Sequence, residues 1–487
     1  MLFNSLQFFY FFIIVSGFYF ILPHRFRWIL LLIASCYFYM YFIPVYIIIL
    51  FFTILIDYGV GIWLEKTKEQ QKKKNILLLS IVANIGILAF FKYYNFFIDN
   101  INILFSTAGL NINPIKHWEI ILPIGLSFHT FQALSYTIEV YRGNFKAEKH
   151  LGIYALYVMY YPQLVAGPIE RPQNILPQFH KIQHWEWSRI SAGLQLMLWG
   201  LFKKVVIADR LSIYVDDIYK NYLTAGVYEV IFASVLFSIQ IYCDFSGYSD
   251  IALGSSRVMG IKLMQNFNRP YAATSISGFW SRWHISLSTW FKDYVYIPLG
   301  GNRVSNIKWI INIVIVFLLS GFWHGASWTF VIWGLLHALY TLIEIPWIKI
   351  TEQKLPTLVK SFWWRSLGTI IVFILVTIAW VLFRAENFTI AKTILHKAAY
   401  GVYSFLYYVK VYGLFYTLKT YTAFIYQSII NSFMIYAIIA LLLAEWKIDL
   451  LNKPFKNNQA SLYMAIIMVL ISILGVTSEG QFIYFQF

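Results

Sequence analysis

SGFWHGASW, at residues 320–328, places one ionisable side chain, the imidazole of His324, inside an apolar segment that spans about 310–340. A group that can carry charge is costly at membrane depth, so a histidine inside a membrane segment indicates a functional site. Gly321 and Gly325 flank this histidine and would let another backbone or a ligand chain come close. The alternative is a histidine whose ring bonds to a neighbouring carbonyl in a helix bundle, and the segment by itself favours neither interpretation.

The composition is that of a polytopic membrane protein. Of the 487 residues, 59% are hydrophobic and only 12% are charged. Apolar segments of roughly 17–25 residues, each long enough to cross a bilayer as a helix, recur along the chain. No polar stretch between them is long enough for a soluble domain. We therefore expect an all-α protein with one integral-membrane domain over residues 1–487 and about 11–14 membrane segments. The expected spans lie near residues 6–22, 28–41, 43–63, 76–97, 119–140, 151–166, 191–208, 226–243, 309–322, 326–345, 367–384, 400–418, 428–445 and 461–477.

The positive charge of the chain indicates membrane topology rather than nucleic-acid binding. The net charge is +16, and in membrane proteins such an excess marks cytoplasmic loops. Basic residues gather at 24–27, 66–74 and 142–149, which predicts that these loops face the cytoplasm and that the N-terminus lies outside. Pro44 lies about midway between the first two clusters, as expected for a two-helix hairpin that leaves and returns to the same side.

The cysteines and the first segment carry little chemical information. Cys36 and Cys243 lie in apolar surroundings without metal or disulfide spacing, so we expect both to be small buried side chains. Residues 6–22 lack a basic leader and a small-residue cleavage site, so this segment is expected to remain as a transmembrane helix.

Residues 244–303 differ from the rest of the chain because charged and aromatic side chains interrupt every apolar run. We expect short tilted helices here that line a funnel on the cytoplasmic side, since irregular backbone at membrane depth persists only inside protein or beside a wet cavity. A belt of amphipathic helices on the lipid surface is the alternative. The charged residues and the histidine are Asp244, Asp250, Arg257, Lys262, Arg269, Arg282, His284, Lys292, Asp293 and Arg303.

Further polar clusters precede His324. They lie at residues 125–132, which contain His129, at 165–172, at 244–252 and at 279–286. We expect His129 to make a hydrogen bond between helices and the adjacent Glu170 and Arg171 to hold a loop. No nucleophile elbow, phosphate-binding glycine loop or HExxH zinc motif occurs, and no metal is expected.

Several of these motifs together resemble the membrane-bound O-acyltransferase family, and within it the bacterial branch of alginate and peptidoglycan O-acetyltransferases. The similarity covers essentially the whole chain. It implies the helical bundle of that family, with His324 as the catalytic histidine and His284 as the second signature histidine, a place that asparagine often fills in eukaryotic members. The motifs are residues 1–5, 165–172, 244–250, Arg282-Trp283-His284, Trp323-His324-Gly325, 381–385 and 482–487.

The chemistry of this family suits the residues. A neutral imidazole can accept a proton from an attacking hydroxyl, and an acetyl thioester is already an activated donor. We expect three tryptophans, Trp280, Trp283 and Trp323, to shape the channel and exclude water. Further expected channel or substrate residues are Asp244, Ser246, Tyr248 and Arg282. Charge and placement suggest that Lys292 and Arg303, with Arg282, contact the phosphates of acetyl-CoA, the expected donor.

The leading hypothesis is a multi-pass enzyme of the bacterial plasma membrane that moves acetyl groups from cytosolic acetyl-CoA to an exported polysaccharide. The exported loops are short; the longest, near residues 99–119, holds no Ser/His/Asp arrangement. We therefore expect an extracytoplasmic acetyltransferase partner, as the resemblance also implies. The first alternative is the D-alanyl transfer protein of teichoic acid from the same family. A proton-coupled transporter or flippase is the alternative of another class, although the absence of an internal repeat disfavours it.

Overall fold

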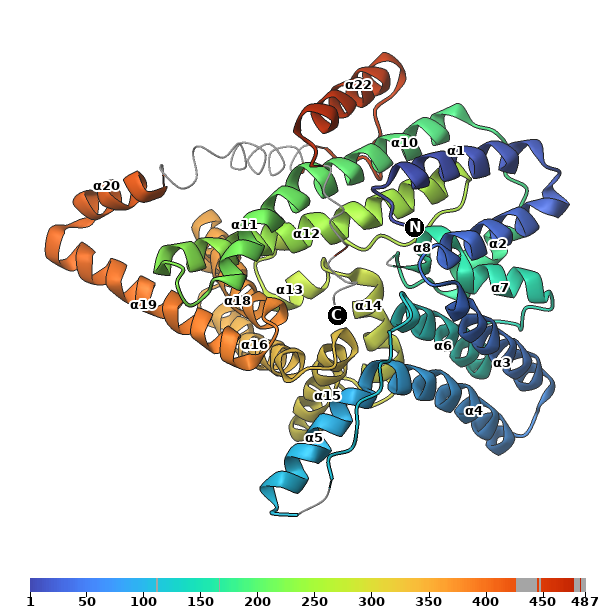
Figure 1. The fold of residues 1–487 in the computed structure, drawn as a ribbon, viewed down its shortest axis with the longest axis horizontal. Coiled ribbons are helices and arrows are strands. Elements are labelled where there is room, and N and C mark those ends of the chain that lie inside the picture. The colour runs from blue at the N-terminus through green and yellow to red at the C-terminus, as the bar shows by residue number, and fades with distance from the viewer. Residues whose placement is uncertain (111–112, 166, 426–444, 446–447, 477–481, 483–487) are drawn as a thin grey trace. The chain divides into compact units, whose positions relative to one another are not determined.

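The computed structural model of this chain describes all residues except 111–112, 166, 426–444, 446–447, 477–481 and 483–487. The described residues form helices and short connections, and this part of the chain contains no β-strand (Figure 1). The all-α fold predicted from the apolar pattern is confirmed.

The chain divides into two compact units. Unit 1 comprises residues 1–197 and 248–265, and unit 2 comprises 198–247 and 266–486. The expectation of a single domain stays a prediction. The elements that begin in unit 1 are α1 (Leu6–Ile21), α2 (His24–Met40), η1 (Pro44–Tyr46), α3 (Ile47–Lys66), α4 (Gln70–Leu88), η2 (Ala89–Tyr93), α5 (Tyr94–Thr107), α6 (Leu126–Arg142), α7 (Leu151–Met159), α8 (Tyr161–Leu164), α9 (Pro172–Phe179) and α10 (Trp187–Phe202).

The elements that begin in unit 2 include a long helical hairpin and several very short helices. They are η3 (Lys203–Ala208), α11 (Asp209–Lys220), α12 (Val227–Val258), η4 (Pro270–Ala272), α13 (Ile276–Trp280), α14 (Ile285–Phe291), η5 (Lys292–Tyr296), α15 (Asn306–His324), α16 (Trp328–Lys354), α17 (Pro356–Val359), α18 (Phe362–Arg384), α19 (Phe388–Tyr412), α20 (Leu414–Ile425) and α22 (Asn457–Leu474).

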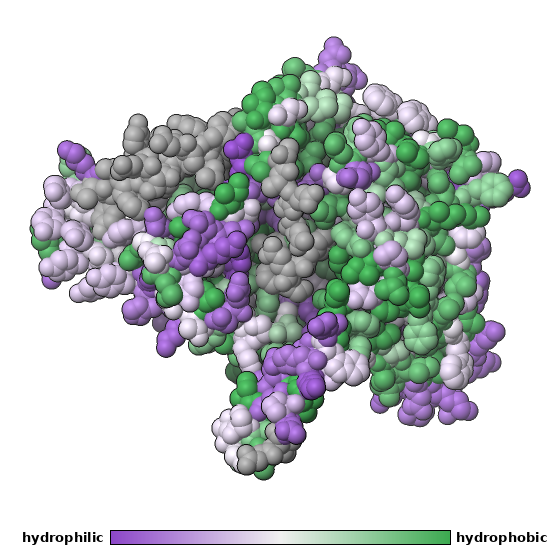
Figure 2. Space-filling view, in the orientation of Figure 1, coloured by the Kyte–Doolittle hydropathy of each residue, from purple (hydrophilic) through white to green (hydrophobic). Residues whose placement is uncertain are grey.

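Eight helical stretches of the described chain are long and apolar enough to cross a membrane, and α1 is a shorter apolar helix. On α1, Leu6, Phe9 and Ile13 are exposed, as expected of side chains that face lipid. Figure 2 shows hydrophobic residues spread over the surface of the N-terminal helices at the right of the view. The chain is thus a multi-pass membrane protein. The eight stretches are Pro44–Lys66, Gln70–Thr107, Trp187–Lys220, Val227–Val258, Asn306–His324, Trp328–Lys354, Phe362–Arg384 and Asn457–Leu474.

Helices α3, α4 and α6 of unit 1 enclose polar side chains that bond to one another. The carboxylate of Asp57 is fully buried and accepts hydrogen bonds from Ser80 Oγ (2.5 Å) and Asn84 Nδ2 (2.8 Å). His129 Nε2 lies 2.8 Å from Thr53 Oγ1, so this histidine joins α6 to α3 as expected. Polar groups inside a membrane bundle are tolerated because each finds a partner on a neighbouring helix.

Glu170 holds a loop of unit 1, as its position in a polar turn predicts. Its carboxylate accepts hydrogen bonds from Asn174 Nδ2 (2.6 Å) and from the backbone N–H of Met264. Burial raises the pKa of Glu170 to about 7.

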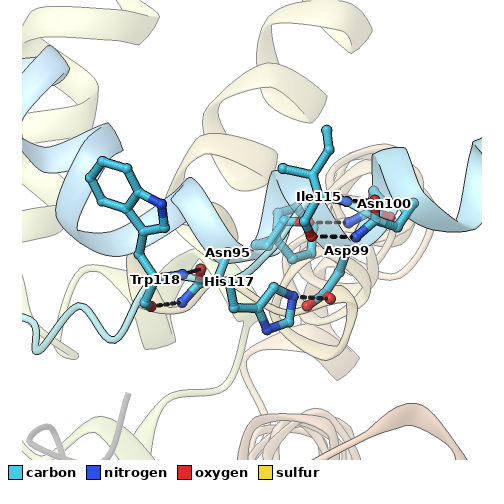
Figure 3. Close-up of polar contacts among 8 residues, drawn as sticks. Asn95, Asp99, Asn100, Ile115, His117 and Trp118 are labelled. Atoms are coloured by element: carbon cyan, nitrogen blue, oxygen red, sulfur yellow. Dashed lines mark hydrogen bonds and ion pairs between the residues drawn. The ribbon is translucent and has the colours of Figure 1, made fainter. Parts of the chain in front are cut away.

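The longest connection predicted from the sequence, near residues 99–119, was wrong at its start, because residues 99–107 belong to α5. Residues 115–118 return beside α5, where two asparagines pair with the backbone (Figure 3). Asn95 exchanges two hydrogen bonds with the backbone of Trp118 (2.9 and 3.1 Å), and Asn102 does the same with Ile115 (3.0 and 2.9 Å). Backbone groups of an irregular segment have no regular backbone partners. The amide side chains of the asparagines thus provide their hydrogen bonds.

In unit 2, α15 and α16 form a hairpin in which the two backbones touch (Figure 1). A Cβ atom on Gly321 would lie 3.3 Å from the Cα of Gly334 and closer still to the carbonyl oxygen of Phe330. A Cβ atom on Gly325 would meet the ring of Phe330. The close approach expected around the histidine is therefore made by the next helix, since small residues let membrane helices come together.

The region after residue 243 agrees with the prediction in part. Residues 260–303 contain the expected short helices η4, α13, α14 and η5. Residues 244–258, however, continue α12 without a break, so the expectation of short helices was wrong for this first part of the region. The helix tolerates Asp244 because Lys204 neutralises it, and Ser256 bonds to the carbonyl of Ile261 (2.9 Å). Whether the short helices form a cytoplasmic funnel stays a prediction.

The boundaries of other helices differ from those of the spans expected from the sequence. The span expected over 119–140 begins as a helix only at Leu126, after Pro123 and a left-handed Gly125 (φ 77°). Helix α11 was not predicted, and α19 begins twelve residues before the expected span at 400–418. The expected span 428–445 lies outside the described residues except for Glu445.

Candidate active site

His324 is the last residue of α15. Gly325 ends the helix, and α16 begins at Trp328, directly after Ser327, whose hydroxyl accepts a hydrogen bond from the backbone N–H of Thr329 (3.3 Å). The side chain of His324 is 5% exposed. The histidine therefore lies at the turn between two helices, whose close approach requires the small residues described above.

Aromatic rings surround the imidazole of His324. The ring centroids of Trp323, Trp333 and Phe383 lie 4.9, 5.1 and 5.2 Å from its own. These rings come from α15, α16 and α18, and each meets the imidazole edge to face. Three helices thus give the histidine an environment that excludes water.

His284 is also buried, and its backbone conformation is unusual. It has φ 45° and ψ 54°, a left-handed conformation that costs a residue other than glycine about 1–3 kcal/mol. Such conformations gather at functional sites. Burial lowers the pKa of His284 to about 3, so its imidazole is neutral at physiological pH.

Hydrogen bonds to Asn266 hold this left-handed turn. The backbone N–H of Ile285 donates to the carbonyl of Asn266 (2.9 Å), and the hydroxyl of Ser286 donates to its side-chain oxygen (2.7 Å). The carbonyl of His284 accepts from the backbone N–H groups of Leu287 and Ser288 (3.0 Å each) as α14 begins. These hydrogen bonds, made by the carbonyl group of His284 and by the residues that follow it, stabilise the left-handed conformation.

One indole lies between the two histidines. The ring centroid of Trp323 is 4.9 Å from that of His324 and 6.1 Å from that of His284. His284 also contacts Phe245 of α12, with ring centroids 4.8 Å apart. The structure thus brings together the two histidines that the sequence selected 40 positions apart.

The other two predicted tryptophans belong to the same cluster of rings. Trp283 is buried, stacks on Phe279 (5.6 Å) and contacts Trp380 (5.0 Å). Trp280 contacts Trp333 at 5.7 Å. Their service as channel walls stays a prediction.

A third histidine, which the sequence argument did not select, lies in this cluster. His337 of α16 is fully buried, and its ring centroid is 4.9 Å from Trp333 and 5.0 Å from Trp280. The criterion that selected His324, a titratable side chain in an apolar segment, applies equally to His337.

Asp244 and Ser246 have protein partners in unit 2. Lys204 Nζ lies 2.7 Å from Asp244 and 2.8 Å from Asp209, and all three side chains are buried. Lys203 donates to Ser246 Oγ (2.9 Å). A role of Asp244 and Ser246 in a channel stays a prediction.

Tyr248 belongs to unit 1. Its ring stacks on that of Phe3, with centroids 4.3 Å apart. Its predicted part in substrate binding likewise stays a prediction.

The predicted phosphate-binding cations lie on the short helices of unit 2 and just after them. Lys292 and Arg303 are exposed. Arg282 is partly buried and donates from Nη1 to the carbonyl of Asn268 (3.3 Å). Their binding of phosphate stays a prediction.

Comparison with known proteins shows the family of this chain. The profile of the membrane-bound O-acyltransferase family matches residues 147–388, which include both His284 and His324. A protein of Azotobacter vinelandii named probable alginate O-acetylase AlgI is 37% identical over 397 residues, which cover 80% of this chain and 76% of the relative.

Two relatives with other names are also similar. The peptidoglycan O-acetyltransferase of Helicobacter pylori is 36% identical over 394 residues, covering 75% of this chain and 72% of that protein. The teichoic acid D-alanyltransferase of Bacillus subtilis is 29% identical over 287 residues, covering 54% of this chain and 69% of that protein. This chain belongs to the membrane-bound O-acyltransferase family, and it is an O-acyltransferase.

Proposed function

We propose that this protein takes acetyl groups from cytosolic acetyl-CoA and moves them across the membrane for O-acetylation of an exported polysaccharide, with His324 as the general base. The observation that carries this proposal is the burial of His324 among three aromatic rings at the junction of α15 and α16. A dry site protects a thioester from water, and a positioned imidazole can activate a hydroxyl.

The chemical step follows from these groups. The hydroxyl oxygen of the acceptor attacks the carbonyl carbon of the thioester while His324 removes the hydroxyl proton. The carbon–sulfur bond then breaks, the acetyl group remains on the acceptor oxygen, and the proton passes to the leaving thiolate. Nothing is oxidised or reduced, and the thioester supplies the driving force.

The names of the relatives support a polysaccharide as the acceptor of the acetyl group. Those at 36–38% identity are named alginate O-acetylases and a peptidoglycan O-acetyltransferase. The D-alanyltransferases, which support the alternative of teichoic acid modification, match at 28–29% over about half of this chain. We therefore favour acetyl transfer to a polysaccharide.

We propose a binding site for acetyl-CoA from the positively charged side chains of unit 2. Lys292 and Arg303 are exposed cations that follow Arg282 along the chain, and acetyl-CoA carries phosphates that such side chains bind. Because basic loops of membrane proteins face the cytoplasm, we place these residues and the loop at 66–74 on the cytosolic side.

We expect unequal effects from two substitutions of His284. His284→Asn should retain most of the acetyl transfer, because an amide can replace an imidazole as a hydrogen-bonding group. His284→Ala should lose most of it, since alanine offers no hydrogen-bonding group at this position. Rates of transfer from labelled acetyl-CoA by purified membranes measure both effects. Wild-type activity in His284→Ala would remove this residue from the mechanism.

The proposal includes an extracytoplasmic acetyltransferase partner. In the segment 113–118, part of the longest exported connection expected from the sequence, the backbone pairs with α5 and His117 bonds to Asp99 of α5 (2.7 Å); no hydrogen bond in the described chain joins a serine to this pair (Figure 3). Purified chain in vesicles, with acetyl-CoA on one side and polysaccharide on the other, tests this. We expect polymer acetylation only when the extracytoplasmic fraction of the producing cell is added. Efficient acetylation by the purified chain alone would contradict the need for a partner.

A further inference from the structure

Two buried N–H groups of α16, in the cluster of rings that includes His324, have no acceptor among the described residues. They are the indole Nε1 of Trp333 and the imidazole Nε2 of His337. Both side chains are fully buried, and they lie four residues apart on α16, which places them on one face of that helix. The ring of Trp333 contacts both His324 (5.1 Å) and His337 (4.9 Å). The two donors therefore belong to the surroundings of the proposed base.

A hydrogen bond determines which nitrogen of His337 carries its proton. Trp280 Nε1 lies 3.3 Å from His337 Nδ1, and an indole nitrogen is only ever a donor. Nδ1 of His337 is therefore the acceptor, and the proton of the neutral ring is on Nε2. The hydrogen bond from Trp280 thus keeps the proton of His337 on Nε2, the nitrogen that has no acceptor among the described residues.

Buried donors without acceptors are rare in folded proteins and are costly to keep. The neighbouring tryptophan shows that this unit satisfies its indoles where it can, because Trp380 Nε1 donates to the hydroxyl of Tyr271 (3.1 Å). Two such donors next to each other, one of them on a ring that contacts the base, suggest that their acceptor arrives with the substrate.

We propose that Trp333 Nε1–H and His337 Nε2–H bind the carbonyl oxygen of the acyl thioester and stabilise the negative charge that this oxygen gains during transfer. The inference rests on the proposed function, because it assigns a role to residues of the same site. When the acceptor hydroxyl attacks, the electron pair of the C=O bond moves to oxygen, and two N–H donors in a dry site stabilise that charge strongly. When the C–S bond breaks, the pair returns and the carbonyl re-forms.

The test uses the full-length protein and two matched tryptophan variants. Trp333→Phe keeps an aromatic ring and removes the N–H group, while Trp380→Phe makes the same change at a buried indole that has a protein acceptor. Loss of one oxyanion donor typically lowers kcat by about 10²–10³-fold. We expect this loss, with little change in KM for acetyl-CoA, in Trp333→Phe and a far smaller loss in Trp380→Phe.

A pair of inhibitors separates this role from simple packing. An analogue of acetyl-CoA with a ketone in place of the thioester keeps the carbonyl oxygen, whereas the S-ethyl thioether lacks it. Wild-type protein should bind the ketone more tightly than the thioether, and Trp333→Phe should lose that preference. A packing defect would weaken both inhibitors equally.

The His337 variants provide a second measurement. His337→Gln keeps an N–H donor and should retain more activity than His337→Leu, which has none. If wild-type protein cleaves acetyl-CoA and both Trp333→Phe and His337→Leu keep its kcat, the inference is wrong although the proposed function stands. If folded wild-type protein leaves acetyl-CoA intact, the proposed function itself fails.

Discussion

Replacing His324 with alanine is expected to lower acetyl transfer by about 10²–10⁴-fold, the usual effect of removing a general base. Trp323, Trp333 and Phe383 have rings in contact with His324, and none of these three side chains can accept a proton in its place. The substituted chain should still fold in the membrane, because alanine fits at the end of a helix. Transfer from labelled acetyl-CoA by purified membranes measures the loss.

His396→Ala is the matched control for this experiment. His396 is exposed on α19, so its removal should leave both the amount of protein and the transfer rate unchanged. Normal expression of His324→Ala together with near-normal acetyl transfer would show that His324 is not the base.

Replacing Lys204 with methionine is expected to destabilise the protein more than any other single charge removal in unit 2. Lys204 lies between Asp209 (2.8 Å) and Asp244 (2.7 Å), and all three side chains are buried. Removing one member of a buried ion group leaves uncompensated charge and typically costs about 3–5 kcal/mol. The melting temperature of the protein purified in detergent should fall sharply, whereas Lys360→Met, at an exposed lysine, should have no effect.

A variant that lacks all three charges tests whether uncompensated charge causes the loss of stability. Lys204→Met combined with Asp209→Asn and Asp244→Asn removes every charge of the group, so most of the lost stability should return. Its activity then reports on Asp244: unchanged acetyl transfer would mean that substrate does not need this carboxylate. A melting temperature of Lys204→Met equal to that of the wild type would contradict the buried ion group.

The elements that the sequence predicted well are those whose apolar pattern decides their structure. The expected spans at 309–322 and 326–345 correspond to α15 and α16, with the break that Gly325 introduces. The continuation of α12 through residue 258 could not be predicted, because charged and polar side chains interrupt the apolar pattern there. Their partners, Lys204 above all, lie elsewhere in the chain, and a pattern along one segment does not reveal them.

The residues of the candidate site, too, could be predicted from the sequence only in part. His324 and His284 could be selected from the sequence, by their apolar setting and by the family resemblance, and the structure joins them through Trp323. His337 could have been found by the same apolar criterion. The role we assign to Trp333 could not, since tryptophan is common in membrane helices and only the structure shows that its N–H group lacks an acceptor in the described chain.

Release of free thiol from acetyl-CoA tests the central claim most directly. Purified wild-type protein and His324→Ala would each be placed in vesicles with acetyl-CoA labelled in the acetyl group outside, and with polysaccharide and the extracytoplasmic fraction inside. The account predicts that the wild type releases thiol as label accumulates on the enclosed polysaccharide, and that His324→Ala does neither. Equal thiol release by both proteins, or movement of protons or solute across the wild-type vesicles while the thioester stays intact, would contradict it.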